Sequence, residues 1–105
     1  MYVEWTKLSW YELTKTLRYW RKRNGSNTYS LKIVDAVEMA QQQIALDPIS
    51  LSYYIPSYKV YRKSLLKGKF YLFYKIEGDR ITIKHFRSVK QAPLYERYEQ
   101  KNKIT

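Results

Sequence analysis

The stretch that decides the fold, residues 58–87, reads YKVYRKSLLKGKFYLFYKIEGDRITIKHFR. Large apolar residues occupy every second position along much of it, which is the period of a strand with one buried face. The second run places on that face Phe70, Leu72, Tyr74 and Ile76, and the third run places there Ile81, Ile83 and His85. On the opposite faces lie Tyr71, Phe73 and Lys75 in the second run, and Thr82, Lys84 and Phe86 in the third. We therefore predict three strands in this stretch.

Two polar breaks with a central glycine separate the runs, KGK at residues 67–69 and EGD at residues 77–79. Glycine readily adopts the positive φ that a tight hairpin needs, so both breaks predict antiparallel connections. The strands also carry many cations, namely Lys59, Arg62, Lys63, Lys75, Arg80, Lys84 and Arg87. A hydrophobic sheet studded with positive charge is the centre of the predicted fold.

The residues before this stretch predict a short strand at residues 2–5 and then a first helix. The helix has an apolar stripe at helical spacing, which we expect to face the core, and the stripe consists of Trp10, Leu13, Leu17 and Trp20. Ser9 and Glu12 fit a capping box at the start of the helix, and Thr6 is the alternative N-cap. Cations crowd the last turn, and Gly25 is a natural residue to end the helix.

A second helix is predicted after Ser26 or Asn27, either of which can cap it. Its apolar stripe consists of Ile33, Val37, Ala40 and Ile44. Pro48 stops the pattern, because the residue before a proline avoids helical angles. Only a few residues around Gly25 and Ser26 separate the two helices, and two helices joined by so short a connection form an antiparallel hairpin. Both must pack on the sheet, because short helices are not stable alone in water.

These elements predict an α+β fold in the order strand, helix, helix and three strands, with the helix hairpin packed on a mainly antiparallel four-stranded sheet. We expect residues 51–57 to form an irregular segment that covers an edge of the sheet. A chain of 105 residues has room for one core. Residues 1–93 are therefore predicted to form one domain, followed by a charged tail at residues 94–105.

The composition excludes several kinds of chemistry. Because the chain has no cysteine and one histidine, it cannot build a disulfide, a thiolate site or a histidine-based zinc site. It contains no Gly-rich phosphate loop and no nucleophile elbow. We therefore expect no metal and no cofactor. No apolar run is long enough to span a bilayer and no signal peptide is recognisable, so we expect a cytoplasmic location.

The charge narrows the choice of partner. The net charge of +11 exceeds the roughly 2 to 8 units that are usual for a small domain. Such an excess argues for a polyanionic partner, either a nucleic acid or an acidic protein. The 12 tyrosines fit two uses, as half-buried strand residues with a solvated hydroxyl or as a platform on which bases stack. The composition leaves both uses open.

The whole pattern resembles the bacterial RelE/ParE toxin superfamily, the toxin half of type II toxin–antitoxin pairs. The segments that carry the resemblance are YWRKRNGSNTYS at residues 19–30, DP after the second helix, YRK at 61–63, FYLFYKI at 70–76 and KQAP at 90–93. The family divides into ribosome-dependent mRNA endonucleases in the manner of RelE and DNA gyrase inhibitors in the manner of ParE. The resemblance therefore implies the fold and leaves the activity open.

The resemblance also implies a site. In RelE-like enzymes cations polarise the phosphate while the 2′-hydroxyl attacks, and a late tyrosine orients the substrate. The positions that match these enzymes are Lys59, Lys90 and Tyr95. Arg62 matches an arginine common in strand two of the wider family, where it serves the site or is a structural or antitoxin-contacting residue. Arg87, two residues beyond His85 on the same face, is either a phosphate contact or a solvated surface cation. His85 is a further catalytic candidate, because imidazole suits proton transfer near neutral pH, but its alternation with Ile81 and Ile83 also fits a partly buried structural residue. The strand-three arginine of many endonucleases falls at Tyr71.

Most other charged residues are expected to be solvated. Among the cations these are Lys63, Lys67, Lys69 and Lys84, and among the helix carboxylates they are Glu12, Asp35 and Glu38. No two carboxylates are placed as a pair for hydrolysis.

Taken with the charge, the resemblance leads us to expect a toxin that blocks translation by cutting mRNA in the ribosomal A site. The alternatives are a non-enzymatic gyrase inhibitor, which the tyrosine at position 71 favours, and a non-toxic RNA-binding module. The expected partners are the ribosome and mRNA, or DNA gyrase, together with an acidic antitoxin segment that covers the sheet or the helix hairpin.

Overall fold

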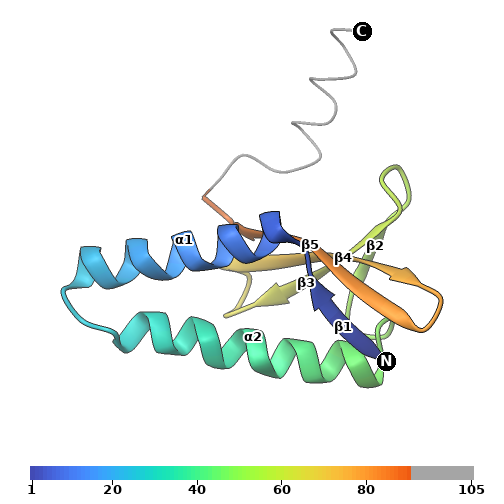
Figure 1. Ribbon diagram of the computed structural model, residues 1–105, viewed down its shortest axis with the longest axis horizontal. Coiled ribbons are helices and arrows are strands. Elements are labelled where there is room, and N and C mark those ends of the chain that lie inside the picture. The colour runs from blue at the N-terminus through green and yellow to red at the C-terminus, as the bar shows by residue number, and fades with distance from the viewer. Residues whose placement is uncertain (91–105) are drawn as a thin grey trace, which may run out of the picture.

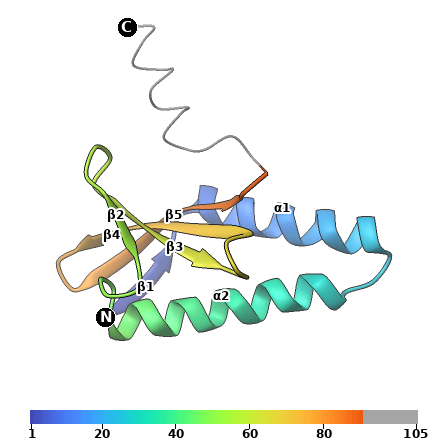
Figure 2. The same ribbon diagram turned by 180° about the vertical axis from the view of Figure 1, so that it is seen from behind.

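The computed structural model describes residues 1–90, so the predicted tail and Tyr95 lie outside the described residues. The chain runs through β1 (Tyr2–Trp5), α1 (Lys7–Asn24), α2 (Thr28–Leu46), β2 (Tyr53–Ile55), β3 (Val60–Leu65), β4 (Phe70–Glu77) and β5 (Arg80–Ser88). Figure 1 shows the two helices lying side by side in opposite directions next to a twisted sheet, and Figure 2 shows the same arrangement from behind. The predicted α+β architecture is confirmed.

The sheet has five strands in the order β1-β5-β4-β3-β2, one more than the sequence predicts. β1 pairs with β5 in parallel, and the other pairings are antiparallel. The additional strand is β2, which lies within the segment that was expected to be irregular and pairs with residues 60–62 of β3. A strand of 3 residues is too short to show a period, which is why the sequence pattern does not mark it.

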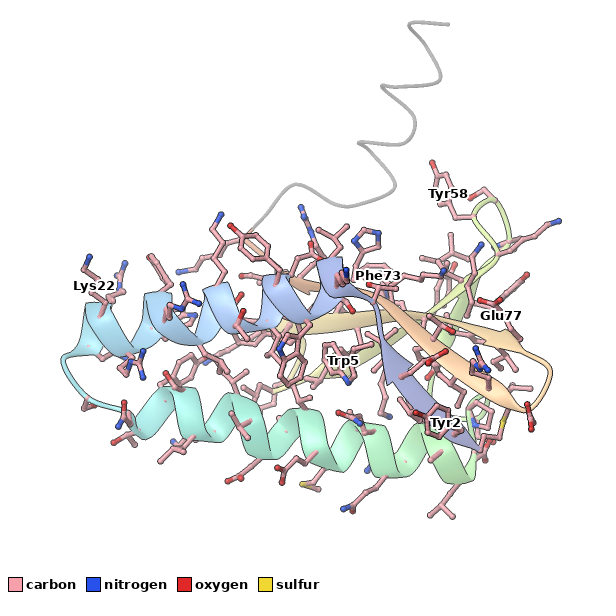
Figure 3. The ribbon with its side chains drawn as sticks, in the orientation of Figure 1. Tyr2, Trp5, Lys22, Tyr58, Phe73 and Glu77 are labelled. Carbon is pink, nitrogen blue, oxygen red and sulfur yellow. The ribbon has the colours of Figure 1, made fainter. Side chains whose placement is uncertain are left out.

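The face of the sheet that the helices cover holds the core. The cluster consists of Leu13, Ile33, Val37, Ala40, Ile44, Leu65, Phe70, Leu72, Tyr74, Ile81, Ile83 and Phe86. Full burial of a large apolar side chain contributes roughly 1.5–3 kcal/mol, so this packing holds both helices on the sheet. Trp5, labelled in Figure 3, adds a polar link between β1 and α2, because its Nε1 donates to Gln41 Oε1 at 3.0 Å. Within residues 1–90, neither helix is long and apolar enough to cross a membrane.

β5 departs from strict alternation at Lys84. Phe73 of β4 pairs with His85, whereas the next residue, Tyr74, pairs with Ile83. Lys84 is therefore an extra residue in β5, which makes a β-bulge. A bulge of this kind reverses the alternation of the strand beyond it, because side chains change face with a period of two.

The bulge moves two side chains to the faces opposite to those predicted. Phe86 joins the core beside Ile83, whereas His85 turns to the other face together with Arg87. The prediction that His85 shares the buried face with Ile81 is therefore wrong. The physical reason is the inserted residue, which simple periodicity does not reveal.

The start of α1 differs from the predicted capping box. Thr6 is the N-cap, and its Oγ1 accepts a hydrogen bond from Ser9 N at 3.0 Å. Ser9 lies inside the helix, and its hydroxyl donates to Ile83 O of β5 at 2.8 Å, so it does not cap the helix with Glu12. The predicted end is confirmed, because Gly25 follows with a φ of 65°, which glycine accommodates without strain.

Trp10 does not face the core as predicted, because its side chain is 55% exposed. The buried line of α1 begins at Ser9, and Trp10 lies about 100° further round the helix. Its ring meets that of Trp5 edge-on, with the ring centroids 5.7 Å apart.

Lys63 is buried although a solvated position was expected. Lys63 pairs with Leu72 of β4 and is two positions from Leu65, so its side chain lies on the core face of β3 with theirs. It is 6% exposed. Desolvation by burial lowers the pKa of its amine.

Candidate functional site

Aromatic and cationic side chains form a row across the sheet face away from the helices. We call this surface the outer face and define it by Arg62, Tyr71, Phe73, His85 and Arg87. Arg62 pairs with Phe73, Phe73 pairs with His85, and Tyr71 pairs with Arg87, so the pleat turns all of them to one side. Phe73 and Arg87 are buried even here. The outer face is therefore a second packed layer rather than a bare sheet.

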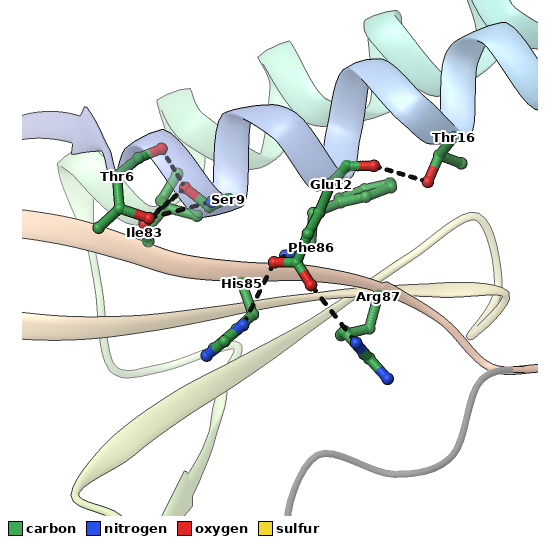
Figure 4. A network of polar contacts seen from close by, with 8 residues as sticks. All are labelled: Thr6, Ser9, Glu12, Thr16, Ile83, His85, Phe86 and Arg87. Atoms are coloured by element: carbon green, nitrogen blue, oxygen red, sulfur yellow. Dashed lines mark hydrogen bonds and ion pairs between the residues drawn. The ribbon is translucent and has the colours of Figure 1, made fainter.

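Glu12 reaches this face from α1 around the edge of β5. β1 pairs only with residues 80–83, and α1 borders the remainder of that edge. Glu12 Oε1 accepts from Phe86 N at 3.3 Å and lies 3.2 Å from His85 Nδ1, and Oε2 lies 3.4 Å from Arg87 Nη1 (Figure 4). The side chains of Glu12, His85 and Arg87 are 8–15% exposed, so little water competes for these contacts.

The carboxylate of Glu12 determines which nitrogen of His85 carries the proton. A carboxylate oxygen accepts hydrogen bonds and donates none, so this contact requires the hydrogen on Nδ1. In the neutral imidazole Nε2 is then the acceptor. Such a pair can take up a proton at Nε2 while the carboxylate stabilises the imidazolium that forms. Within the described residues, no group of three or more His, Asp or Glu side chains is placed to hold a metal ion.

Two tyrosine rings hold the guanidinium of Arg62. Its Cζ lies 5.1 Å from the ring centroid of Tyr53 on β2 and 4.8 Å from that of Tyr71 on β4. The attraction between a guanidinium and an aromatic ring is about 0.5–1 kcal/mol at an exposed site. A guanidinium also carries N–H groups that can donate to a phosphate.

Two of the predicted site residues, Lys59 and Lys90, do not join this group. Lys59 lies in the turn before β3, with a φ of 55°, and Lys90 follows β5, with its Nζ 5.9 Å from the ring centroid of Trp20. The antiparallel register puts these two lysines near opposite ends of the strands. The structure therefore brings together Arg62, His85 and Arg87, but neither lysine.

A cleft of 490 Å³ lies between α1 and the end of β5, and we call it the α1–β5 cleft. Its α1 side carries the exposed apolar side chains of Leu8, Tyr11 and Tyr19. Lys15 and Lys90 also line it. The cleft therefore combines apolar contact area with positive charge.

Sequence reasoning missed Glu12 and the rings beside Arg62. The helix pattern assigns Glu12 to an exposed face, but it contacts β5 from the same side of α1 as Ser9. The spacing of these two residues was a usable signal, because positions three apart on a helix are neighbours. They form two successive polar contacts along one edge of β5 instead of a capping box.

Comparison with known proteins identifies the fold. The chain matches no protein-family model and no curated protein. It is similar to a chain of the solved structure described as the chromosomal ParDE TA system from P. aeruginosa, with a TM-score of 0.66 and 20% sequence identity. The match covers 86% of this chain and 97% of that chain. The likeness confirms the RelE/ParE-like fold, and at this identity it speaks for the fold alone.

Proposed function

We propose that this protein is the toxin of a type II toxin–antitoxin pair and that it inhibits translation by cutting mRNA on the ribosome. The resemblance to RelE/ParE toxins and the fold shared with a chain of a ParDE TA system support the first part. The net charge of +11 suits a nucleic-acid target, because phosphate contacts dominate such binding. The side chains of the outer face support the second part.

The observation that carries cleavage is the contact between Glu12 and His85. In the proposed step, His85 Nε2 takes the proton of an RNA 2′-hydroxyl, and the oxygen attacks the adjacent phosphorus. The bond from phosphorus to the 5′-oxygen breaks, and that oxygen takes the proton from the imidazolium of His85, which leaves a 2′,3′-cyclic phosphate, a 5′-hydroxyl and a neutral imidazole. Glu12 stabilises the imidazolium between the two proton transfers.

Cations on the same face offset the charge that develops on the phosphate. We assign the main phosphate contact to Arg62, because Arg87 is 6% exposed and shares its charge with Glu12. Lys59 and Lys90, near opposite ends of the strands, suit contacts to the RNA backbone on either side of the cut. The proposed role of Tyr95 is to orient the substrate.

A gyrase inhibitor of the ParE type is the second candidate. The fold shared with a ParDE chain favours it, and so does the tyrosine at position 71, where many endonucleases carry an arginine. A third candidate is an RNA-binding module without toxicity, for which Arg62 between Tyr53 and Tyr71 would serve as a stacking platform.

Induced expression in a bacterial host, with pulse labelling of protein and DNA synthesis, separates the three candidates. Early arrest of protein synthesis is the result expected for an mRNA endonuclease. Early arrest of DNA synthesis while translation continues would favour the gyrase inhibitor. Unimpaired growth at full expression would contradict the toxin proposal and leave the RNA-binding module.

The proposed protein partner is an acidic antitoxin segment that docks in the α1–β5 cleft. Leu8, Tyr11 and Tyr19 offer apolar area there, and Lys15 and Lys90 offer charge that complements an acidic chain. Apolar burial has to supply most of the affinity, because exposed ion pairs contribute only about 0–1 kcal/mol each.

A further inference from the structure

Positive charge is distributed unevenly along this chain. Residues 33–58 contain Asp35, Glu38 and Asp47 but neither lysine nor arginine, so the rest of the chain holds all 20 of these cations. The cation-free residues form most of α2, the connection at residues 47–52 and the edge strand β2. Among the described residues, positive groups from outside also reach this region: the Met1 amine donates to Ala45 O at 2.8 Å, and the Cζ of Arg62 lies 5.1 Å from the ring centroid of Tyr53.

Large apolar side chains are exposed at the corner where α2 passes into β2. We call Leu46, Ile49, Leu51 and Tyr54 the corner patch. Leu46 is 89% exposed and Leu51 is 71% exposed, and the other two are also exposed. Single exposed apolar residues are ordinary, but a group of them marks an interaction surface.

The corner patch is built on a fixed turn. Asp47 Oδ1 accepts from Ile49 N at 3.3 Å and from Ser50 N at 3.2 Å, and hydrogen bonds from Ser50 and Ile49 lower the pKa of its carboxyl. The Tyr74 hydroxyl lies 2.6 Å from Pro48 O and 2.5 Å from Ser52 Oγ, which ties the turn to β4. A surface held in this way binds without first having to become ordered.

β2 adds an open edge to the patch. It is the last strand of the sheet, and its outer side pairs with no strand among residues 1–90. The ring of Tyr54 lies 4.7 Å from that of Tyr61, which in turn stacks on Tyr74 at 5.6 Å between centroids. Tyr54 is therefore the outer end of a row of rings. Exposed edges of this kind readily pair with a strand of another chain.

We propose that the corner patch is a self-association surface, at which two copies of this chain pair β2 with β2 in antiparallel fashion about a two-fold axis near Tyr54. The partner is a second copy because the outer edge of β2 can pair with its own two-fold copy, and residues 33–58 carry no lysine or arginine that would repel the other chain of net charge +11. The antiparallel arrangement also turns Lys59, after β2 of one copy, toward the turn that holds Asp47 of the other. This proposal does not depend on the proposed function.

Sedimentation of the full chain at concentrations up to about 100 μM tests the proposal, because the apolar contact predicts a dimer that persists at about 0.5 M salt. The double variant Leu46→Lys, Leu51→Lys should sediment as a monomer while keeping the wild-type circular dichroism. Leu31→Lys is the matched control, because Leu31 is also exposed on α2 but lies outside the patch, and it should behave as wild type. A strictly monomeric wild type would overturn the proposal and leave the corner to a different protein. Dimerisation of the double variant equal to that of wild type would also overturn it.

Cysteine cross-linking tests the position of the axis. The chain has no cysteine, so Tyr54→Cys introduces a single thiol per copy. Residues directly opposite each other in an antiparallel pair have Cβ atoms about 4.5–5.5 Å apart, close enough for a disulfide to form after a small shift. We expect Tyr54→Cys to form disulfide-linked dimers readily on mild oxidation and Leu8→Cys, on α1, to remain monomeric. Equal cross-linking of both variants, or of neither, contradicts the β2 pairing.

Discussion

Glu12 is the residue on which the outer face depends most. One carboxylate meets the backbone N–H of Phe86, the imidazole of His85 and the guanidinium of Arg87. It therefore attaches α1 to the edge of β5 and sets the proton position on His85. Both tasks need a carboxylate that reaches β5 from this turn of α1. The same contact links folding to the proposed chemistry.

Replacing Glu12 with alanine should lower the free energy of unfolding by about 3 kcal/mol, because it leaves the largely buried Arg87 without this carboxylate. Urea denaturation measures the loss. The matched control is Glu4→Ala, whose ion pair with Arg80 at 3.0 Å is exposed and should contribute only about 0.5 kcal/mol. Equal losses in the two variants would show that Glu12 has no special structural role.

Lys63 predicts a dependence of stability on pH. Burial lowers the pKa of its amine from 10.5, so between the folded value and 10.5 the unfolded chain binds more protons than the folded chain. Stability from this residue therefore rises with pH across that window. Lys63→Met should be more stable than wild type by about 1 kcal/mol at neutral pH, because it removes a desolvated charge.

The advantage of Lys63→Met should shrink as the pH approaches 10.5, which paired denaturation curves at several pH values would measure. Lys69→Met is the control, because Lys69 is exposed in a turn and should show no such trend. A difference from wild type that stays constant with pH would contradict the desolvation argument.

At the scale of elements, a regular period predicts the buried faces of β4 and α2, but it misplaces Trp10 of α1. The faces of β4 and the buried stripe of α2 follow from spacing alone, because side chains repeat every second residue in a strand and about every 3.6 residues in a helix. The bulge at Lys84 does not follow, since periodicity cannot count an inserted residue. For that reason the faces of β5 beyond the bulge, and with them the position of His85, became known only from the structure.

The contacts between α1 and β5 could not be predicted from the sequence either. Ser9 and Glu12 look like a local capping box, but their partners Ile83 and His85 lie more than 70 positions along the chain. A short sequence motif suggests hydrogen-bond partners within the same helix, whereas in the folded chain the partners of Ser9 and Glu12 belong to β5.

Thr6→Ala should destabilise the protein by about 1 kcal/mol, because the N-cap hydroxyl satisfies the backbone N–H of Ser9 at the start of α1. Thermal denaturation measures the effect. Thr14→Ala is the control, since its hydroxyl bonds to Tyr11 O, an acceptor within the same helix, and its loss should cost little. If both substitutions have the same effect, Thr6 does not act as the cap.

At the scale of the whole molecule, charge divides the surface into a basic part and a part without lysine or arginine, which suit different proposed partners. Lys22, at the far end of α1 in Figure 3, belongs to the basic part, whereas the corner patch belongs to the cation-free part. The basic part suits RNA and an acidic antitoxin. The cation-free part suits neither polyanion, because it offers no positive side chain to pair with them.

A complex with the proposed acidic antitoxin segment should survive about 0.5 M salt, because screening weakens ion pairs but leaves intact the apolar contacts proposed in the α1–β5 cleft. Gel filtration of the purified complex at increasing salt measures this. Tyr11→Ala should weaken the complex at every salt concentration, whereas Met39→Ala, on the exposed side of α2, should not. Complete dissociation of the wild-type complex at that salt concentration would mean that screened charges alone hold it.

The most direct measurement of the central claim is to map the 5′ ends of an mRNA after incubation with purified protein, with and without translating ribosomes. We expect new ends inside codons of ribosome-bound mRNA, each carrying a 5′-hydroxyl, and none on naked mRNA. Folded His85→Ala should produce no cleavage and Arg62→Ala should produce at least about tenfold less, whereas Lys69→Ala should cut as wild type does. Intact mRNA on ribosomes treated with wild-type protein, together with loss of DNA supercoiling by gyrase in a parallel reaction, would contradict the account.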